Sequence, residues 1–139
     1  MKIVIDTSVW ISALITKDSK AREIIKMVFK KELYPQMSEA LFKEYESVMK
    51  RDKIQRLTPL GKEEQNELFN AYLSCCNWNE VYYSWRPNLK DEDDNFVVEL
   101  AVASGAEYII TYNTKDFQKS ELIFRHTIIT PEEFIKEFK

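Results

Sequence analysis

Acidic side chains occur at four places in this sequence from which they could share a cation. They are Asp6, Glu44, the run Asp91, Glu92, Asp93 and Asp94, and Asp116. Two carboxylates about 4 Å apart repel each other by roughly 4 kcal/mol at an effective dielectric constant of 20, so three or four that converge need protons or a metal ion. The chemistry that these residues predict is that of a divalent metal site with oxygen ligands.

Asp6 is the hardest of these residues to explain without a function. It ends the aliphatic run IVI, which is typical of a buried strand, and it is followed by Thr7 and Ser8. A buried carboxylate without partners costs several kcal/mol or loses its charge, so we expect groups nearby that compensate it. Taken alone, however, Asp6 could also be a helix cap or a turn residue.

The other acidic residues each have a simpler alternative explanation. Glu44 could be a solvated helix residue, residues 91–94 could cap a helix and favour its dipole, and Asp116 could be a turn residue. Oxygen-only ligation favours Mg²⁺ or Mn²⁺ over zinc, and Mg²⁺ usually combines few carboxylates with water and phosphate oxygens. The combined pattern therefore favours hydrolysis of phosphodiesters by a metal-bound water.

Histidine and cysteine chemistry is disfavoured. The single histidine, His126, has no catalytic partner nearby in the sequence. Cys75 and Cys76 are adjacent, which strains a mutual disulfide, and no second pair completes a zinc site. We expect both cysteines to be small buried residues.

The composition is that of an ordinary globular protein, with 45% hydrophobic and 31% charged residues. A net charge of −3 argues against tight, purely electrostatic binding of nucleic acid. No apolar stretch approaches the roughly 20 residues of a membrane span, and residues 1–15 lack the features of a signal peptide. We expect one domain over residues 1–139, a soluble cytoplasmic protein, and no membrane partner.

Hydrophobic periodicity predicts short strands that alternate with helices. Strands are expected at residues 2–6, 33–37, 81–85, 107–111 and 127–129, and helices at 9–15, 21–29, 38–49, 64–76, 96–103 and 131–138, with a loop at 52–61. Ser38 is the expected N-cap of one helix, and Gly105 the expected C-cap of another. Thr130, Pro131 and Glu133 predict a capping box, with proline at the first helical position, at the start of the last helix. This alternation favours an α/β fold with a central parallel sheet covered on both faces.

Parallel sheets bind ligands beyond the carboxyl ends of their strands. Asp6 and the loop at residues 112–116 both follow predicted strands, so we expect them to face one pocket.

Four segments of the chain are IVIDTSVWISAL, SEALFKEYESVMKR, DEDDNFVVELAVASGAEYIITYN followed by KDF, and TIITPEEF. In this order and spacing, from residue 2 to about residue 135, they resemble the PIN domain, and most of all its prokaryotic branch of VapC-like toxin components of toxin–antitoxin pairs. The resemblance implies a three-layer α/β/α fold and Mg²⁺- or Mn²⁺-dependent ribonuclease activity. It also implies RNA as substrate, a small antitoxin protein as partner, and homodimerisation.

The resemblance carries over to individual residues. Asp6 matches the aspartate after the first strand, Glu44 the helix glutamate, and Asp94 the aspartate seven residues before Ala101, with Asp93 as the alternative if the register is shifted by one. Ser8 matches a supporting hydroxyl. Asp6, Glu44, Asp94 and Asp116 are thus the implied catalytic residues, and Asp6, Asp94, Asn113 and Asp116 the implied metal ligands.

The sequence departs from the family pattern at Asn113, where many members carry an aspartate. One anionic ligand is lost, although the amide oxygen of Asn113 can still bind a metal or its water, and Asp116 follows three residues later. We expect a weaker second metal site. The alternative is a catalytically weak PIN-like module that binds RNA or protein.

Two other α/β classes fit less well. A haloacid-dehalogenase phosphatase needs a second aspartate where this chain has Ser8, and a receiver domain needs an acid pair at the first strand and an aspartate on a central strand.

The sequence indicates the residues that contact RNA less clearly than it indicates the acidic site. Basic residues that could meet its backbone are Lys17, Lys20, Arg22, Lys50, Arg51, Lys53 and Arg56, and aromatic residues that could stack on bases are Trp10, Trp85 and Tyr112. Solubility is the commoner role of such lysines, and core packing that of such tryptophans.

Overall fold

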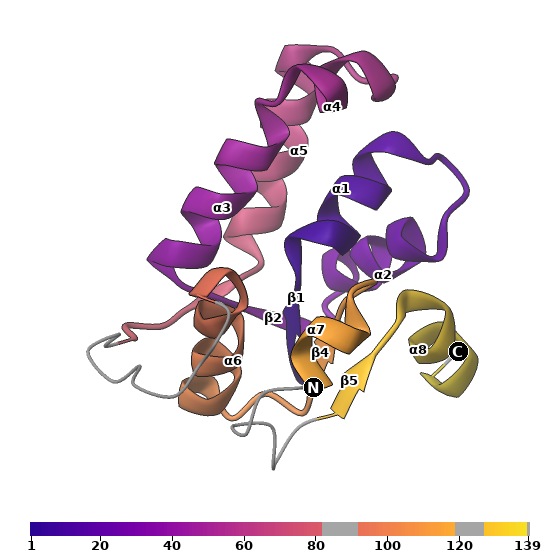
Figure 1. Ribbon diagram of the computed structural model, residues 1–139. Coiled ribbons are helices and arrows are strands. Elements are labelled where there is room, and N and C mark those ends of the chain that lie inside the picture. Colours follow the sequence, from indigo (N-terminus) through magenta and orange to yellow (C-terminus); the bar gives the residue numbers. More distant parts are fainter. Residues whose placement is uncertain (82–91, 119–126, 139) are drawn as a thin grey trace.

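The structure is a computed structural model, and it describes residues 1–81, 92–118 and 127–138, without the side chains of residues 92–95, 116 and 118. Its centre is a parallel sheet of five strands in the order β3-β2-β1-β4-β5 (Figure 1). The strands are β1 (Lys2–Ile5), β2 (Tyr34–Met37), β3 (Asn77–Trp78), β4 (Tyr108–Ile110) and β5 (Thr127–Ile129). The predicted parallel sheet is confirmed.

The order of the strands creates a switch point in the middle of the sheet. From β1 the chain builds outward through β2 to β3, and then returns to place β4 on the other side of β1, followed by β5. The crevice at such a reversal, beyond the carboxyl ends of the strands, is where open α/β sheets bind ligands. In this protein the switch point lies between the carboxyl ends of β1 and β4.

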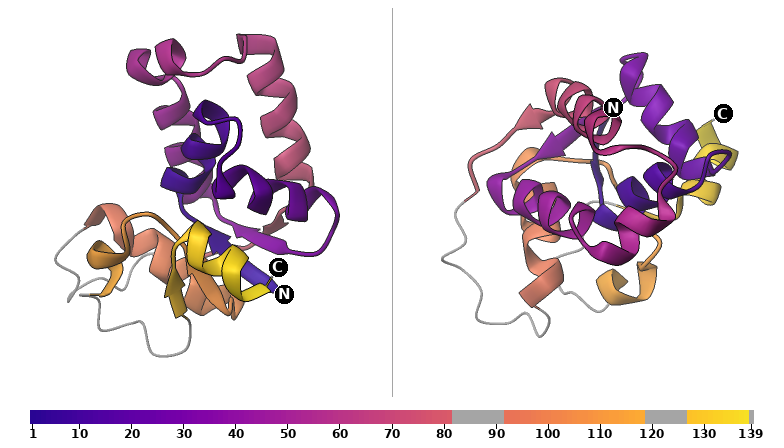
Figure 2. Two further views of the ribbon diagram at one scale, coloured as in Figure 1. Left: turned by 90° about the vertical axis from the view of Figure 1, so that its right-hand side faces the viewer. Right: turned by 90° about the horizontal axis from the view of Figure 1, so that it is seen from above.

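Helices cover the sheet on both sides. They are α1 (Thr7–Ile15), α2 (Lys20–Phe29), α3 (Glu39–Met49), α4 (Asp52–Leu57), α5 (Lys62–Ser74), α6 (Glu92–Ser104), α7 (Thr114–Gln118) and α8 (Pro131–Phe138). Helix α6 contacts β1, β2 and β4, whereas α2 contacts α1 and α8. Figure 2 shows α6 and α2 on opposite sides of the central strands, which gives the expected three layers.

The central strands are apolar because they are covered on both faces. Ile3, Val4 and Ile5 of β1, and Ile109 and Ile110 of β4, are all completely buried. A strand buried on both faces needs consecutive apolar residues, not alternating ones, which is why the sequence reads as short aliphatic runs. The first polar residue after each run therefore marks the carboxyl edge of the sheet.

The predicted caps are confirmed. The Ser38 hydroxyl accepts a hydrogen bond from the backbone N–H of Leu41 at 3.3 Å, and Gly105 adopts a φ of 70° directly after α6. Thr130 and Glu133 form the expected capping box of α8, with the Glu133 N–H donating to Thr130 Oγ1 at 3.2 Å and the Thr130 N–H donating to Glu133 Oε1 at 3.3 Å.

An arm of three helices rises from one end of the sheet (Figure 1). Its two long members are α3 and α5, and α4 joins them at the far end. The predicted loop at residues 52–61 was wrong, because residues 52–57 form α4. Ile54 is buried, and the Gln55 amide donates to the Met49 carbonyl at 2.6 Å and to Gln65 Oε1 at 2.9 Å. These contacts stabilise a helix that is too short to be recognised by periodicity.

The predicted edge strand at residues 81–85 lies outside the described residues except for Val81, which is not in a strand. The edge of the sheet beside β2 is formed instead by Asn77 and Trp78. None of the helices within the described ranges is both long enough and apolar enough to cross a membrane.

Candidate active site

Asp6 and Thr111 meet across the switch point of the sheet. Asp6 directly follows β1, and Thr111 directly follows β4. The Thr111 hydroxyl donates a hydrogen bond to Asp6 Oδ2 at 2.8 Å, and the Asp6 N–H extends the strand pairing by donating to the Ile110 carbonyl at 3.0 Å. The two strand ends are thus joined at the place where the fold favours a ligand site.

The carboxylate of Asp6 does not cap a helix. Asp6 occupies the N-cap position of α1, yet its side chain makes no capping hydrogen bond, unlike the side chains of Ser19 and Ser38 before α2 and α3. Its Oδ2 accepts hydrogen bonds from Ser8 Oγ at 2.8 Å and from Thr111 Oγ1. Only 5% of Asp6 is exposed, so these hydroxyls and the positive end of α1 compensate a buried charge.

One oxygen of Asp6 is left available. Both hydrogen bonds end on Oδ2, and in the described part of the chain no donor reaches Oδ1. The Ser8 hydroxyl also accepts from the Tyr112 N–H at 3.2 Å, and Thr111 Oγ1 accepts from the Asn113 N–H at 2.9 Å. Each hydroxyl therefore has an acceptor and a donor, which fixes its proton toward Asp6.

Glu44 is brought to the same edge through Thr7. Glu44 lies on α3, which starts directly after β2, and the Thr7 hydroxyl donates to Glu44 Oε1 at 2.5 Å. Thr7 is the neighbour of Asp6 in the sequence. One residue thus carries the Asp6 carboxylate, and the next one binds the Glu44 carboxylate. Glu44 is half-buried, which places its charge at the border of the solvent.

Tyr45, the neighbour of Glu44, anchors α3 to β1. Its hydroxyl donates to the carbonyl of Ile5 and lies 3.3 Å from the hydroxyl of Tyr72 on α5. Burial is the main reason why the pKa of Tyr45 is raised well above its usual value, with the charges of Cys76, Asp6 and Glu44 adding to the effect and the hydrogen bond from Tyr72 opposing it. The phenol stays protonated and keeps donating. Glu44 and Tyr45 thus attach α3 to the residues on both sides of Asp6.

The remaining acidic candidates lie on α6 and α7. Helix α6 ends at Ser104, whose carbonyl accepts from Lys2 Nζ at the amino edge of the sheet. Its 13 residues span roughly 20 Å, so its first turn, which contains Asp93 and Asp94, lies toward the opposite, carboxyl edge. Asp116 is in α7, which follows β4. The side chains of these three residues lie outside the described part of the structure.

The described side chains fit part of a site for a hard cation. Asp6 and Glu44 offer carboxylate oxygens and Asn113 an exposed amide, with no histidine or cysteine among them. Within the described ranges, no group of three or more His, Cys, Asp or Glu residues is placed to hold a metal. A complete ligand set therefore requires the side chains carried by α6 and α7.

Comparisons with known proteins agree with this geometry. A family model of the PIN domain matches residues 2–115. The chain belongs to the PIN domain family. PIN domains are generally nucleases and generally use divalent metal ions. The resemblance noted in the sequence is thereby confirmed.

A solved structure supports the fold of this PIN domain. It is the crystal structure of VapBC2 from Rickettsia felis bound to a DNA fragment from their promoter, and one chain of it aligns with a TM-score of 0.64 at 16% identity over 94% of this chain and 98% of that chain. A search of curated proteins gave no match.

The sequence did not identify two hydroxyls that organise this PIN domain site. Thr7 and Thr111 were visible only as polar residues at strand ends, and their roles depend on partners 37 and 105 positions away. A signal was nevertheless present, because Thr111 ends the second aliphatic run as Asp6 ends the first.

The structure decides two of the expected contacts to RNA. Trp10 is completely buried and cannot stack on a base. The Arg22 guanidinium is engaged by the Ala13 carbonyl, at 2.9 Å from Nε and 2.6 Å from Nη2, so it is not a free contact for phosphate. Tyr112 is exposed and remains a candidate, whereas Trp85 lies outside the described residues.

The cysteines are free, as expected, and Cys76 is buried. Burial, only partly opposed by a hydrogen bond with Tyr72, raises the pKa of the Cys76 thiol to about 12, so it is not a thiolate at neutral pH. Cys75 is only half-buried. His126 lies outside the described residues.

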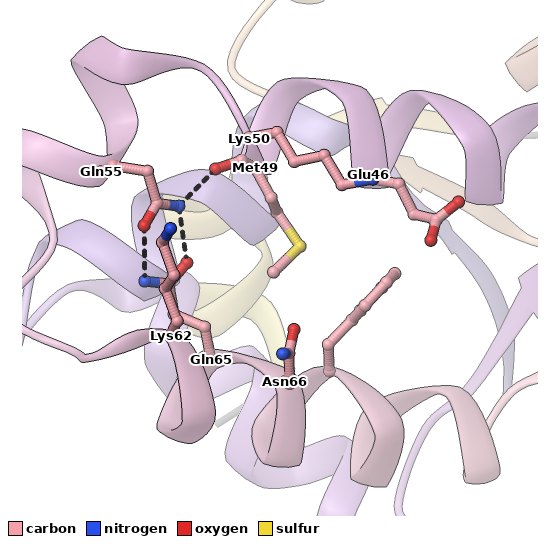
Figure 3. A pocket seen from close by; sticks show the side chains of 8 residues that line it. Glu46, Met49, Lys50, Gln55, Lys62, Gln65 and Asn66 are labelled. Carbon is pink, nitrogen blue, oxygen red and sulfur yellow. Dashed lines mark hydrogen bonds between the residues drawn. The ribbon is translucent and has the colours of Figure 1, made fainter.

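A cavity of about 440 Å³ lies within the arm, and of the acidic candidates with described side chains neither Asp6 nor Glu44 lines it (Figure 3). Side chains of α3, α4 and α5 line it: Glu46, Met49, Lys50, Gln55, Lys62, Gln65, Asn66 and Phe69. Gln55 and Gln65 exchange two amide hydrogen bonds, at 2.9 and 3.1 Å, at one end of it. The amides serve to join α4 to α5, and none of the candidate catalytic residues reaches this cavity.

Replacing Thr111 by valine is expected to lower the free energy of unfolding by about 1–3 kcal/mol, because the buried Asp6 carboxylate and the Asn113 N–H each lose a partner. Thr111→Ser keeps the hydroxyl, so its free energy of unfolding should fall less than that of the valine variant. Urea denaturation measures both. Equal stability of the two variants would show that the hydroxyl does not compensate Asp6.

Proposed function

We propose that the protein is a metal-dependent endoribonuclease that hydrolyses phosphodiester bonds of single-stranded or structured RNA, and that it acts as the toxin of a toxin–antitoxin pair. The observation that carries the proposal is the buried Asp6 carboxylate, which is held by two hydroxyls at the switch point, and whose neighbour Thr7 donates a hydrogen bond to Glu44. Membership of the PIN family supports the same activity. Residues 1–139 are proposed to form one nuclease domain.

In this proposal each polar residue of the carboxyl edge has a role. Asp6, Asp94, Asn113 and Asp116 hold Mg²⁺ or Mn²⁺, and Glu44 completes the catalytic set with Asp6, Asp94 and Asp116. Ser8 and Asp93 support the site. A bound Mg²⁺ or Mn²⁺ would polarise the phosphate and lower the pKa of a water molecule.

The described side chains contribute orientation. Ser8 and Thr111 fix one oxygen of Asp6 and leave Oδ1 for the ion, while Thr7 fixes Oε1 of Glu44. Because these hydroxyls are already hydrogen-bonded before substrate binds, the site needs little reorganisation.

We further propose a small antitoxin as partner, a homodimer as assembly and the cytoplasm as location. The similar crystal structure is of a VapBC2 complex, which supports an antitoxin partner.

A binding module without efficient turnover is the second candidate. The observation that favours it is the exposed amide of Asn113, which offers one neutral oxygen where many PIN domains have a carboxylate. Fewer charged ligands weaken the binding of a divalent ion.

Thermal melting with and without Mn²⁺ separates the two candidates. At a Mn²⁺ concentration 100 times the Kd, the native state gains about 2.7 kcal/mol, which we expect as a Tm higher by several degrees and reversed by EDTA. The same samples should cleave a mixed RNA pool only with metal. RNA binding with no metal-dependent change in Tm and no cleavage would support the module, and neither binding nor cleavage would overturn both.

A further inference from the structure

Tyr112 lies close to Asp6. It is the second residue after β4, and its backbone N–H donates to Ser8 Oγ at 3.2 Å, while the same hydroxyl donates to Asp6 Oδ2 at 2.8 Å. One serine thus separates the backbone of Tyr112 from the proposed metal ligand.

Tyr112 is held by hydrogen bonds of its backbone N–H and of its hydroxyl and is nevertheless partly exposed to solvent. Its hydroxyl donates to Glu132 Oε1 at 3.2 Å, and Glu132 is in the first turn of α8. Even so, 37% of the residue is exposed. A ring held in this way loses little conformational freedom when a flat ligand stacks on it.

The negative charges around the ring disfavour a phosphate and favour a neutral ligand. Glu132 is negative at the hydroxyl end, and the Asp6 carboxylate lies behind the backbone end. Burial is also the main cause that raises the pKa of the Tyr112 phenol, with the Glu132 charge adding to it and a hydrogen bond with Ser12 opposing it, so the ring carries no charge at neutral pH. An uncharged aromatic face between two carboxylates favours an uncharged, flat partner.

We propose that Tyr112 is the platform on which one unpaired nucleobase stacks beside the cleavage site, so that the protein accepts RNA that is single-stranded at that point. This inference rests on the proposed ribonuclease function. Bases within a duplex are covered by their neighbours, whereas unpaired bases can be splayed onto aromatic side chains. Each such contact contributes about 1–3 kcal/mol when it is tested by alanine substitution, which corresponds to a 5- to 150-fold change in affinity.

The test is binding of a fluorescein-labelled single-stranded RNA octamer, measured by anisotropy in EDTA, which stops metal-dependent cleavage. Tyr112→Leu should weaken binding by about 5- to 150-fold, whereas Tyr112→Phe should stay within about twofold of the wild type because it keeps the ring. Tyr34→Leu is the matched control, since Tyr34 is also exposed, at 45%, but begins β2 at the amino edge of the sheet. Affinity for a blunt RNA duplex should not change in any variant.

Cleavage in Mn²⁺ provides a second readout. Tyr112→Leu should raise KM for the octamer more than it lowers kcat, which a general loss of structure would not do. Equal affinity of the wild type and Tyr112→Leu for the octamer would overturn the stacking role. An equal loss of affinity in Tyr112→Leu and Tyr112→Phe would also overturn it, because the hydroxyl and not the ring would then bind the RNA. In both cases wild-type cleavage would leave the ribonuclease function standing, whereas a wild type that neither binds nor cleaves the octamer or the mixed RNA pool would overturn both.

Discussion

Replacing Asp6 by asparagine should reduce metal-dependent RNA cleavage by roughly 10²- to 10⁴-fold, which is the loss expected when several kcal/mol of charge stabilisation by a metal are removed. Asparagine has nearly the same shape as aspartate but lacks the charge, and Asp6 Oδ1 accepts no hydrogen bond from the described part of the chain. The measurement is the rate of cleavage of a labelled RNA at saturating Mn²⁺, together with the rise in Tm caused by Mn²⁺.

The variant should still fold, because the asparagine oxygen can accept the hydrogen bonds from Ser8 and Thr111 and no buried charge remains to be compensated. Asp18→Asn is the matched control, since Asp18 is an exposed residue of the turn between α1 and α2. It should keep the wild-type rate. Wild-type cleavage by a folded Asp6→Asn variant would exclude Asp6 as a metal ligand and with it the proposed site.

The fold could be predicted where local rules and burial agree. The aliphatic runs of β1 and β4 predicted buried parallel strands, and the capping box at Thr130 predicted the start of α8. Helix α4 was missed for a physical reason. It has six residues, Pro59 and Gly61 follow shortly after its end, and it depends on hydrogen bonds of Gln55 and on the burial of Ile54. Tertiary contacts, not periodicity, stabilise it.

The sequence predicted where the candidate site lies, but not all of the hydrogen bonds between its side chains. Asp6 was singled out because a charge ended a buried strand, and the structure places it at the switch point. The family resemblance indicated Ser8 as a supporting hydroxyl, and Ser8 does donate to Asp6. The sequence could not show that Thr111, 105 residues away, also donates to Asp6, or that Thr7 donates to Glu44. Glu44, Asp94 and Asp116 were candidates by residue type, the family resemblance assigned their roles, and these roles stay predictions.

Trp10 is the residue whose truncation should destabilise the protein most. It follows Asp6 by four positions on α1, is completely buried, and packs its ring against both long helices of the arm. The ring centroids lie 5.9 Å from Tyr45 on α3, and 4.6 and 5.6 Å from Tyr72 and Phe69 on α5. Trp10→Ala should cost about 3–5 kcal/mol, a large part of a typical total stability of about 5–15 kcal/mol.

The destabilisation should also reach the active site. Trp10 joins α1 to α3, and α3 holds Glu44 through the bond to Thr7. A cavity between these helices frees α3 to shift, so Trp10→Ala should lower kcat even at temperatures where the variant is folded. Trp10→Phe keeps an aromatic ring and removes an indole N–H that has no hydrogen-bond partner among the described residues. Its free energy of unfolding should therefore fall much less than that of Trp10→Ala.

Trp78→Ala provides the matched control for this change. Trp78 lies on the edge strand β3, is 53% exposed, and packs on Phe42 at a centroid distance of 5.7 Å. The same atoms are removed, but little cavity is created, so the loss in urea denaturation should be about 1 kcal/mol or less. If Trp10→Ala and Trp78→Ala were equally stable, the arm would not be held to α1 by the tryptophan. The route from the core to Glu44 would then have to run through Tyr45 and its hydrogen bond to Ile5.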